Sequence, residues 1–143
     1  MEFAKSHSAG FLANHMARLF ANGLQRRLKV LGLAPAQFMV LLELWEEDGL
    51  TQVALVERLD VEQATMANTL TRMERDGLIQ RKPSQSDKRS KLVFLTQKAQ
   101  MLQRDATEAA AAQNAEALAG LGQDEREALL KLMQKVISTM RRG

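Results

Sequence analysis

The chain has 143 residues and a mass of 16.0 kDa, which is the size of one ordinary globular domain. Its 20 Lys and Arg and 17 Asp and Glu leave a net charge of +3, so a nucleic-acid signal must lie in how the charge is distributed. The absence of cysteine excludes disulfides, thiolate metal sites, a cysteine nucleophile and a thiol redox sensor.

The longest uncharged stretches, 6–17 and 30–42, are shorter than the roughly 18 apolar residues that a membrane span needs. The first residues lack the basic and then apolar layout of a secretory signal. These features lead us to expect a cytoplasmic protein without a membrane partner.

Two helices are predicted in the first third of the chain. Apolar residues recur at steps of three and four from Leu12 to Leu31, which describes one helix face, and Gly32 ends this helix. Pro35 suits the first position of a second helix, because its missing N–H would be unpaired there in any case. Asp48 and Gly49 close the second helix.

The next segment reads as a helix-turn-helix. Thr51 can cap a short helix that runs to Leu59, and 60–61 form its turn. A second helix is expected over 62–76, ending at Gly77, where a left-handed cap costs no steric strain. A short helix, a tight turn and a second helix are typical of DNA-binding domains.

Beyond Gly77 the apolar period changes from 3.6 to 2. Two strands, 78–82 and 91–95, flank a turn-rich polar stretch and predict a two-stranded hairpin. Thr96 can cap a long helix to about Ala119, and 120–122 break it. The last helix carries an amphipathic stripe made of Leu129, Leu130, Met133, Val136, Ile137 and Met140.

Positive charge is concentrated between residues 72 and 91. This segment holds seven basic and three acidic residues, a local charge of +4, whereas the rest of the chain sums to −1. Such a surface can bind along the phosphate backbone of a nucleic acid. The alternative is a charged face that contacts only solvent.

The helix over 62–76 exposes side chains that suit a major groove. Asn pairs bidentately with adenine, Arg pairs with guanine, and Thr or Ala contacts the thymine methyl group. For each residue, base contact and a merely solvent-exposed role remain alternatives. The candidates on this helix are Gln63, Thr65, Ala67, Asn68, Thr71, Arg72 and Arg75.

Four segments in sequence order, 50–61, 64–65, 72–79 and 87–96, resemble the MarR family of bacterial transcription regulators. They include the Asp87-Lys88-Arg89 form of the wing signature, and the flanking helices have the lengths used in that family. The resemblance implies a mainly α fold with a small β wing, in which a winged helix-turn-helix DNA-binding region, 34–96, joins a helical dimerisation region, 1–33 and 97–143.

The resemblance also implies roles for the wing and the second helix. The helix over 62–76 would enter the major groove and Arg89 the adjacent minor groove, while Asp87 would hold the wing through an ion pair with Arg72 or Arg89. Family members often have Thr or Ser followed by Arg where this chain has Ala67 and Asn68, which implies a different operator. The remaining DNA-binding candidates are Thr51, Arg81, Lys88 and Lys91.

The apolar stripes of the first and last helices exceed what one compact winged domain needs to cover, so we expect a homodimer on an inverted-repeat operator. The resemblance further implies a cleft for small aromatic or phenolic anions. It would be lined by Met16, Arg18, Phe20, Phe38 and Leu42, although for the apolar members a role in the core is the favoured alternative.

An enzyme is not expected, because no catalytic triad or phosphate-binding glycine loop is visible. His7 and His15 have no neighbouring carboxylate and give a weak metal signal, so no metal or cofactor is predicted. We therefore expect a sequence-specific repressor. The alternative is a helical interaction or ligand-binding protein whose winged domain no longer reads DNA.

Overall fold

The computed structural model describes residues 2–87 and 89–143 of the chain. In this part, a 3-10 turn over Lys5–His7 precedes α1 (Ala9–Lys29), α2 (Pro35–Glu46), β1 (Leu50–Thr51), α3 (Gln52–Leu59), α4 (Gln63–Arg75), β2 (Ile79–Pro83), β3 (Lys91–Leu95), α5 (Gln97–Ala117) and α6 (Gln123–Arg142). The fold is mainly helical with a small antiparallel sheet, as predicted. None of these helices has the length and apolar character needed to cross a membrane.

Local capping signals fix where several helices begin and end. The Thr51 hydroxyl accepts a hydrogen bond from the Ala54 N–H at 3.1 Å, and Thr96 accepts one from Ala99 at 3.2 Å. Gly77 has a φ of +75°, the left-handed conformation expected after α4. The predicted starts of α3 and α5 are confirmed.

The wing is a three-stranded sheet in the order β1-β3-β2, whereas the sequence predicted a hairpin of two strands. The additional strand, β1, contributes Leu50 opposite Val93 of β3. On the other side, β2 pairs with β3 in antiparallel register. The β1 pairing attaches the start of α3 to the base of the wing.

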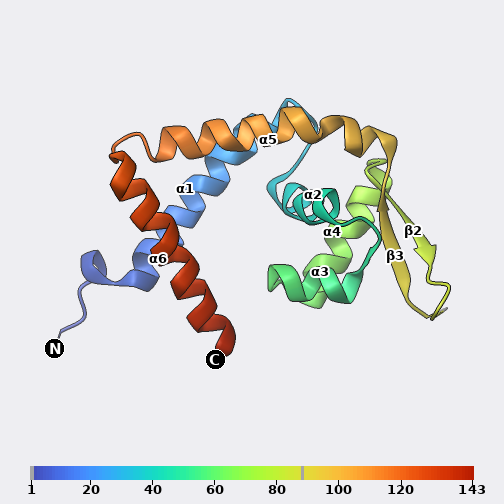
Figure 1. The fold of residues 1–143 in the computed structure, drawn as a ribbon, viewed down its shortest axis with the longest axis horizontal. Helices are drawn as coiled ribbons and strands as arrows, with labels where there is room; N and C mark the ends of the chain where they lie inside the picture. The colour runs from blue at the N-terminus through green and yellow to red at the C-terminus, as the bar shows by residue number, and fades with distance from the viewer. Residues whose placement is uncertain (1, 88) are drawn as a thin grey trace.

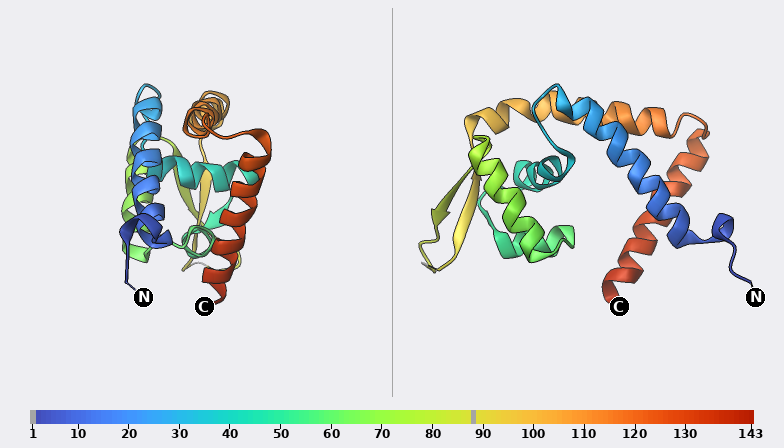
Figure 2. Two further views of the ribbon diagram at one scale, coloured as in Figure 1. Left: turned by 90° about the vertical axis from the view of Figure 1, so that its left-hand side faces the viewer. Right: turned by 180° about the vertical axis from the view of Figure 1, so that it is seen from behind.

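The described chain is an arch. In Figure 1, α5 crosses the top, α1 and α6 descend at one end, and the winged region with α2, α3 and α4 occupies the other. The views in Figure 2 show that α1 packs against α5 and descends obliquely away from it. No residue of α6 is buried, so one face of this helix remains uncovered within a single chain.

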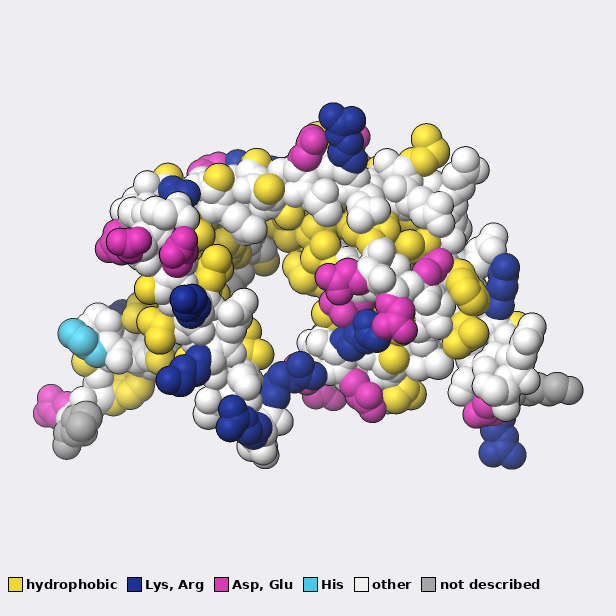
Figure 3. Space-filling view, viewed as in Figure 1, with side chains coloured by type: hydrophobic (Ala, Val, Ile, Leu, Met, Phe, Trp, Pro, Cys, Tyr) yellow, Lys and Arg dark blue, Asp and Glu magenta, His cyan; other side chains and the backbone are white. Residues whose placement is uncertain are grey.

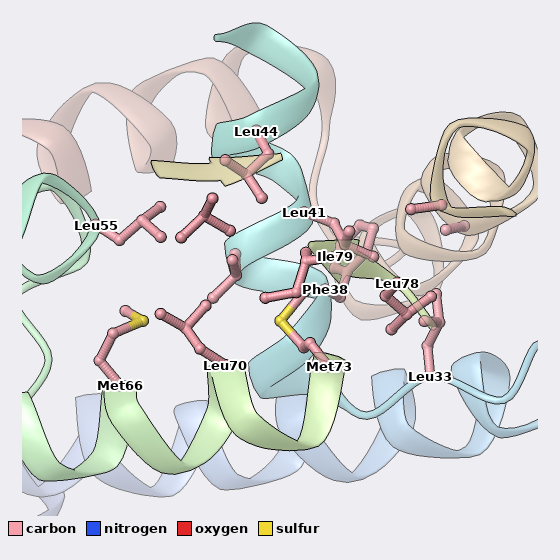
Figure 4. Packing of buried hydrophobic residues seen from close by; sticks show 14 of the residues in the cluster. Leu33, Phe38, Leu41, Leu44, Leu55, Met66, Leu70, Met73, Leu78 and Ile79 are labelled. Carbon is pink, nitrogen blue, oxygen red and sulfur yellow. The ribbon is translucent and has the colours of Figure 1, made fainter. Parts of the chain in front are cut away.

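The core lies in the winged region, where α2 is surrounded by α3, α4 and the sheet. Figure 4 shows Met66, Leu70 and Met73 rising from α4 toward α2, and all three are at most 2% exposed. Burial of this stripe orients α4, so its opposite, polar face points to solvent.

Asp76 joins α4 to its neighbours at the end of this helix. Its Oδ2 accepts from Gln37 Nε2 at 2.9 Å, its Oδ1 lies 3.1 Å from Arg75 Nε, and its backbone carbonyl accepts from Lys98 Nζ at 2.8 Å. The hydrogen bond from Gln37 and then that from Arg75 hold the pKa of the Asp76 carboxyl below its usual range.

We expect Asp76→Asn to lower the free energy of unfolding at pH 7 by about 0.5 kcal/mol, a modest loss because the carboxylate is partly exposed. A lowered folded pKa contributes stability above the unfolded pKa, which is near 3.8, and this contribution disappears as pH falls through the folded pKa. Urea titrations at pH 7, 5 and 3 should therefore show the difference shrinking below pH 4. Asp105→Asn, an exposed site on α5, is the control.

Candidate nucleic-acid interface

The polar face of α4 is available for contact. Met66, Leu70 and Met73 are buried on the other side, which leaves the predicted DNA-facing positions on the outer surface. Ala67 alone among these positions is half-buried. The exposed ones are Gln63, Thr65, Asn68, Thr71, Arg72 and Arg75.

Thr71 connects α4 to the wing. Its hydroxyl donates to the Ala67 carbonyl at 2.9 Å and accepts from Arg81 Nη2 at 3.2 Å. The hydroxyl hydrogen is therefore used within the helix, and the methyl group remains to contact a base. Arg81 Nε is buried and has no hydrogen-bond partner in the described part of the chain. Through the hydrogen bond from its Nη2 to Thr71, Arg81 fixes the base of the wing against α4.

The wing tip is shaped by Asp87, but not through the ion pair that the family resemblance implied. Its Oδ1 accepts from the backbone N–H of Arg89 at 3.0 Å and its Oδ2 from the Ser90 hydroxyl at 3.3 Å. Within the described residues Asp87 forms no ion pair with Arg72 or Arg89. The Arg89 side chain is exposed and its charge stays available. Lys88, the other predicted wing-tip residue, lies outside the described residues.

A hollow of about 280 Å³ lies between the wing, α4 and the start of α3. We call it the basic hollow, because among the described residues three cations and no carboxylate line it. The N-terminus of α3 opens toward it, and a helix N-terminus favours anions. Its lining consists of Thr51, Gln52, Val53, Leu70, Arg81, Arg89, Ser90, Lys91 and Val93.

Gln52 and Ser90 are members of the basic hollow that the sequence analysis did not select. Gln52 directly follows the capping Thr51, so its backbone N–H belongs to the first turn of α3. The place of Gln52 directly after the predicted helix cap was the sequence signal that could have identified it. Thr51 itself lines the hollow, although its hydroxyl is already used as the cap.

The other cations of this surface differ in how free they are. Arg75 is paired with Asp76, and Lys82 Nζ lies 5.5 Å from the centre of the Phe94 ring. Arg72 is exposed and takes part in none of the ion pairs of the described residues. The charge available for DNA is therefore concentrated on Arg72 and the rim of the basic hollow.

A second hollow, the apolar hollow, lies under the arch between α1, α2 and α5 and has a volume of about 510 Å³. Four predicted pocket residues, Met16, Phe20, Phe38 and Leu42, line it. Arg18, the fifth, is exposed on α1 and is not part of the lining. Met133 of α6 closes one side.

The end of the arch opposite the wing carries exposed apolar side chains, visible in yellow in Figure 3. Large apolar side chains on α6 are 37–73% exposed, which is unusual for a chain that functions alone. They are accompanied on α1 by Phe11, Leu12 and Leu19. On α6 they are Leu130, Leu132, Met133, Val136, Ile137 and Met140.

Within residues 2–87 and 89–143, no three His, Asp or Glu side chains come together as metal ligands. His7 contacts Ser6, and the His15 ring lies 6.2 Å from that of Phe11.

Comparison with known proteins gives consistent results. A sequence model of the MarR family matches residues 33–91. The transcriptional regulator HosA of Escherichia coli is 32% identical over 107 residues, which are 75% of this chain and 79% of HosA. A mutant MarR from E. coli complexed with operator DNA is 27% identical, with a TM-score of 0.83 and coverage of 89% of this chain and 91% of that chain. PcaV of Streptomyces coelicolor in complex with its natural ligand is 25% identical, with a TM-score of 0.83 and coverage of 96% and 97%.

Proposed function

The chain belongs to the MarR family of winged helix-turn-helix transcription regulators, and from this premise we propose that it is a homodimeric repressor of an inverted-repeat operator. The observation that carries the proposal is the polar face of α4 beside a basic hollow without carboxylates. In this proposal α4 enters the major groove, the wing tip enters the neighbouring minor groove, and a backbone phosphate occupies the basic hollow.

In this proposal DNA binding and dimerisation lie at opposite ends of the arch. Residues 34–96 read DNA, and residues 1–33 with 97–143 form the dimer. The exposed apolar faces of α1 and α6 support the dimer, because a second copy would remove them from water. A two-fold axis there would set two copies of α4 about 34 Å apart, one turn of DNA.

The apolar hollow is the proposed effector site. Its lining combines α1 and α5 of the dimerisation region with α2 of the DNA-binding region. A ligand that prefers one spacing of these helices would change the separation of the two α4 helices and thereby the affinity for DNA. The solved PcaV complex contains that protein's natural ligand, which supports ligand binding as a property to test here.

Selection from a pool of random duplexes at near-physiological salt tests the proposal. We expect an enriched inverted repeat with half-site centres about ten base pairs apart. Retention of every duplex with steep salt dependence would contradict sequence-specific reading. No retention at all would favour the alternative, an interaction or ligand-binding protein that no longer reads DNA.

Arg89→Ala is expected to weaken binding to all duplexes by roughly tenfold, because the lost guanidinium contributes electrostatic attraction more than base identity. Fluorescence anisotropy at several salt concentrations would measure both affinity and its salt dependence. Arg104→Ala removes the same charge from α5, where the side chain is 86% exposed and paired with Glu108, and serves as the control. Unchanged affinity for Arg89→Ala would show that the wing does not contact DNA.

Asn68→Ala is expected to change sequence preference instead of general affinity. Loss of a bidentate contact with adenine costs about 1–3 kcal/mol at one base pair in each half-site. Competition among operators that differ at single positions would locate that base pair. Asn14→Ala, whose side chain hydrogen-bonds within α1, removes the same amide without altering α4. An unaltered preference would remove Asn68 from the reading surface.

A further inference from the structure

The apolar hollow lacks the cation that an anionic effector needs. Among the described residues of a single chain, its lining contains no Asp, Glu, Lys, Arg or His, and its polar members are the amides of two adjacent residues of α5. The lining consists of Ala13, Met16, Ala17, Phe20, Ala21, Leu24, Pro35, Phe38, Met39, Leu42, Ala110, Gln113, Asn114 and Met133. A carboxylate entering this hollow would lose its hydration without gaining a counter-charge.

The cation nearest to the polar end is already neutralised. Arg27 of α1 donates through Nη1 to Gln113 Oε1 and through Nη2 to the Glu116 carboxylate. The hydrogen bond and the charge of Arg27 hold the pKa of Glu116 below its usual range, so Glu116 remains ionised at neutral pH. A second anion at Arg27 would have to share the guanidinium with Glu116.

Gln113 is fixed with its amino group free. The side chain is 8% exposed and lies against Gly23, where the absence of a Cβ admits the amide. Because a guanidinium only donates, the oxygen of Gln113 must face Arg27. Within the described residues Nε2 makes no hydrogen bond, and this nitrogen is therefore the donor that Gln113 can offer a ligand.

We infer that the effector is an uncharged, largely apolar molecule with one hydrogen-bond acceptor, bound by Gln113 Nε2 and packed between Phe20 and Phe38. The inference rests on the proposed effector site and replaces the aromatic anion that the family resemblance implied. The apolar contacts supply affinity, and the Gln113 amide orients the ligand. A volume of about 510 Å³ admits a molecule with two fused rings.

Three naphthalenes of similar shape test this inference by equilibrium dialysis against the full chain at pH 7.5. They are 2-acetylnaphthalene, which carries a neutral acceptor, 2-ethylnaphthalene, which carries none, and 2-naphthoate, which is an anion. We expect the ketone to bind about fivefold tighter than the hydrocarbon, the effect of one hydrogen bond. Its advantage over naphthoate should be at least roughly tenfold, because the anion remains unpaired.

Gln113→Met keeps the length of the side chain and removes the donor. We expect the affinity for the ketone to fall to within about twofold of that for the hydrocarbon, because the hydrogen bond is lost. Gln103→Met, at an exposed position of the same helix, should leave all three affinities unchanged. The order of the three affinities in the unsubstituted chain tests the inference even if Gln113→Met does not fold.

Naphthoate binding as tightly as the ketone, or more tightly, would overturn the inference. So would the absence of binding by all three compounds, as expected if a helix of the second subunit fills the hollow. Duplex selection on the same preparation separates the two proposals. An enriched inverted repeat without naphthalene binding leaves the regulator and removes this ligand class. The predicted order of affinities without duplex enrichment would support this ligand class and remove the sequence-specific regulator.

Discussion

Ile137→Asp should convert a dimeric protein into a monomer and lower its affinity for the operator by at least about a hundredfold. Ile137 is 55% exposed on α6 and lies among Val136, Met140 and Met133, which share its helix face. In a dimer this face would be buried, and an unpaired aspartate there would lose its hydration. Loss of one of two linked half-site contacts reduces avidity by about 10²–10⁴.

Light scattering after size exclusion measures the mass, and titration of an operator duplex measures affinity. Ser138→Asp is the matched control, since it adds the same charge to the neighbouring residue, which points away from the apolar stripe. The control should remain dimeric and bind normally. A dimer that survives Ile137→Asp would place the interface elsewhere.

Leu41→Ala should lower the free energy of unfolding by about 2–5 kcal/mol, because it leaves a cavity in a core that relaxes only partly. Leu41 has no exposed surface, and Figure 4 shows it extending from α2 toward Ile79 and Phe38. This region connects α2 to both α4 and the sheet. Loss of the Leu41 side chain should therefore destabilise the whole winged region and not a single helix.

Urea unfolding at a fixed protein concentration checks this expectation, since the proposed dimerisation would make apparent stability depend on concentration. Val30→Ala removes apolar atoms from a side chain that is 86% exposed and should change stability by less than about 0.5 kcal/mol. A similarly small effect of Leu41→Ala would mean that the packing around α2 is looser than described.

The sequence predicted the elements whose ends are specified locally. The caps at Thr51 and Thr96 and the left-handed Gly77 each depend on interactions within a few residues, so their signals are present in the local sequence. β1 was missed because it contains two residues and exists only through its pairing with β3, about 40 residues later. Periodicity cannot reveal a strand so short.

The candidate site also has one part that the local sequence specifies and one part that depends on residues distant in the sequence. The polar face of α4 follows from helical spacing, and its exposure agrees with that expectation. The basic hollow could not be predicted, because it requires the start of α3 to meet the wing. For Asp87 the expected interaction was an ion pair. The carboxylate instead accepts hydrogen bonds from the Arg89 N–H and the Ser90 hydroxyl within its own turn, which are closer in sequence.

The long helix α5 has a mechanical consequence. Its start is attached to the link between α4 and β2, because Thr96 and Lys98 donate to the Gly77 and Asp76 carbonyls, whereas Gln113 lies beside the apolar hollow. About 24 Å of continuous helix separates Gln97 from Gln113. A tilt of about 5° at the hollow would therefore move the base of the wing by about 2 Å, if the helix behaves as a rigid rod. The helix is a lever arm that converts a small angle into a displacement several times larger than the distance range of a hydrogen bond.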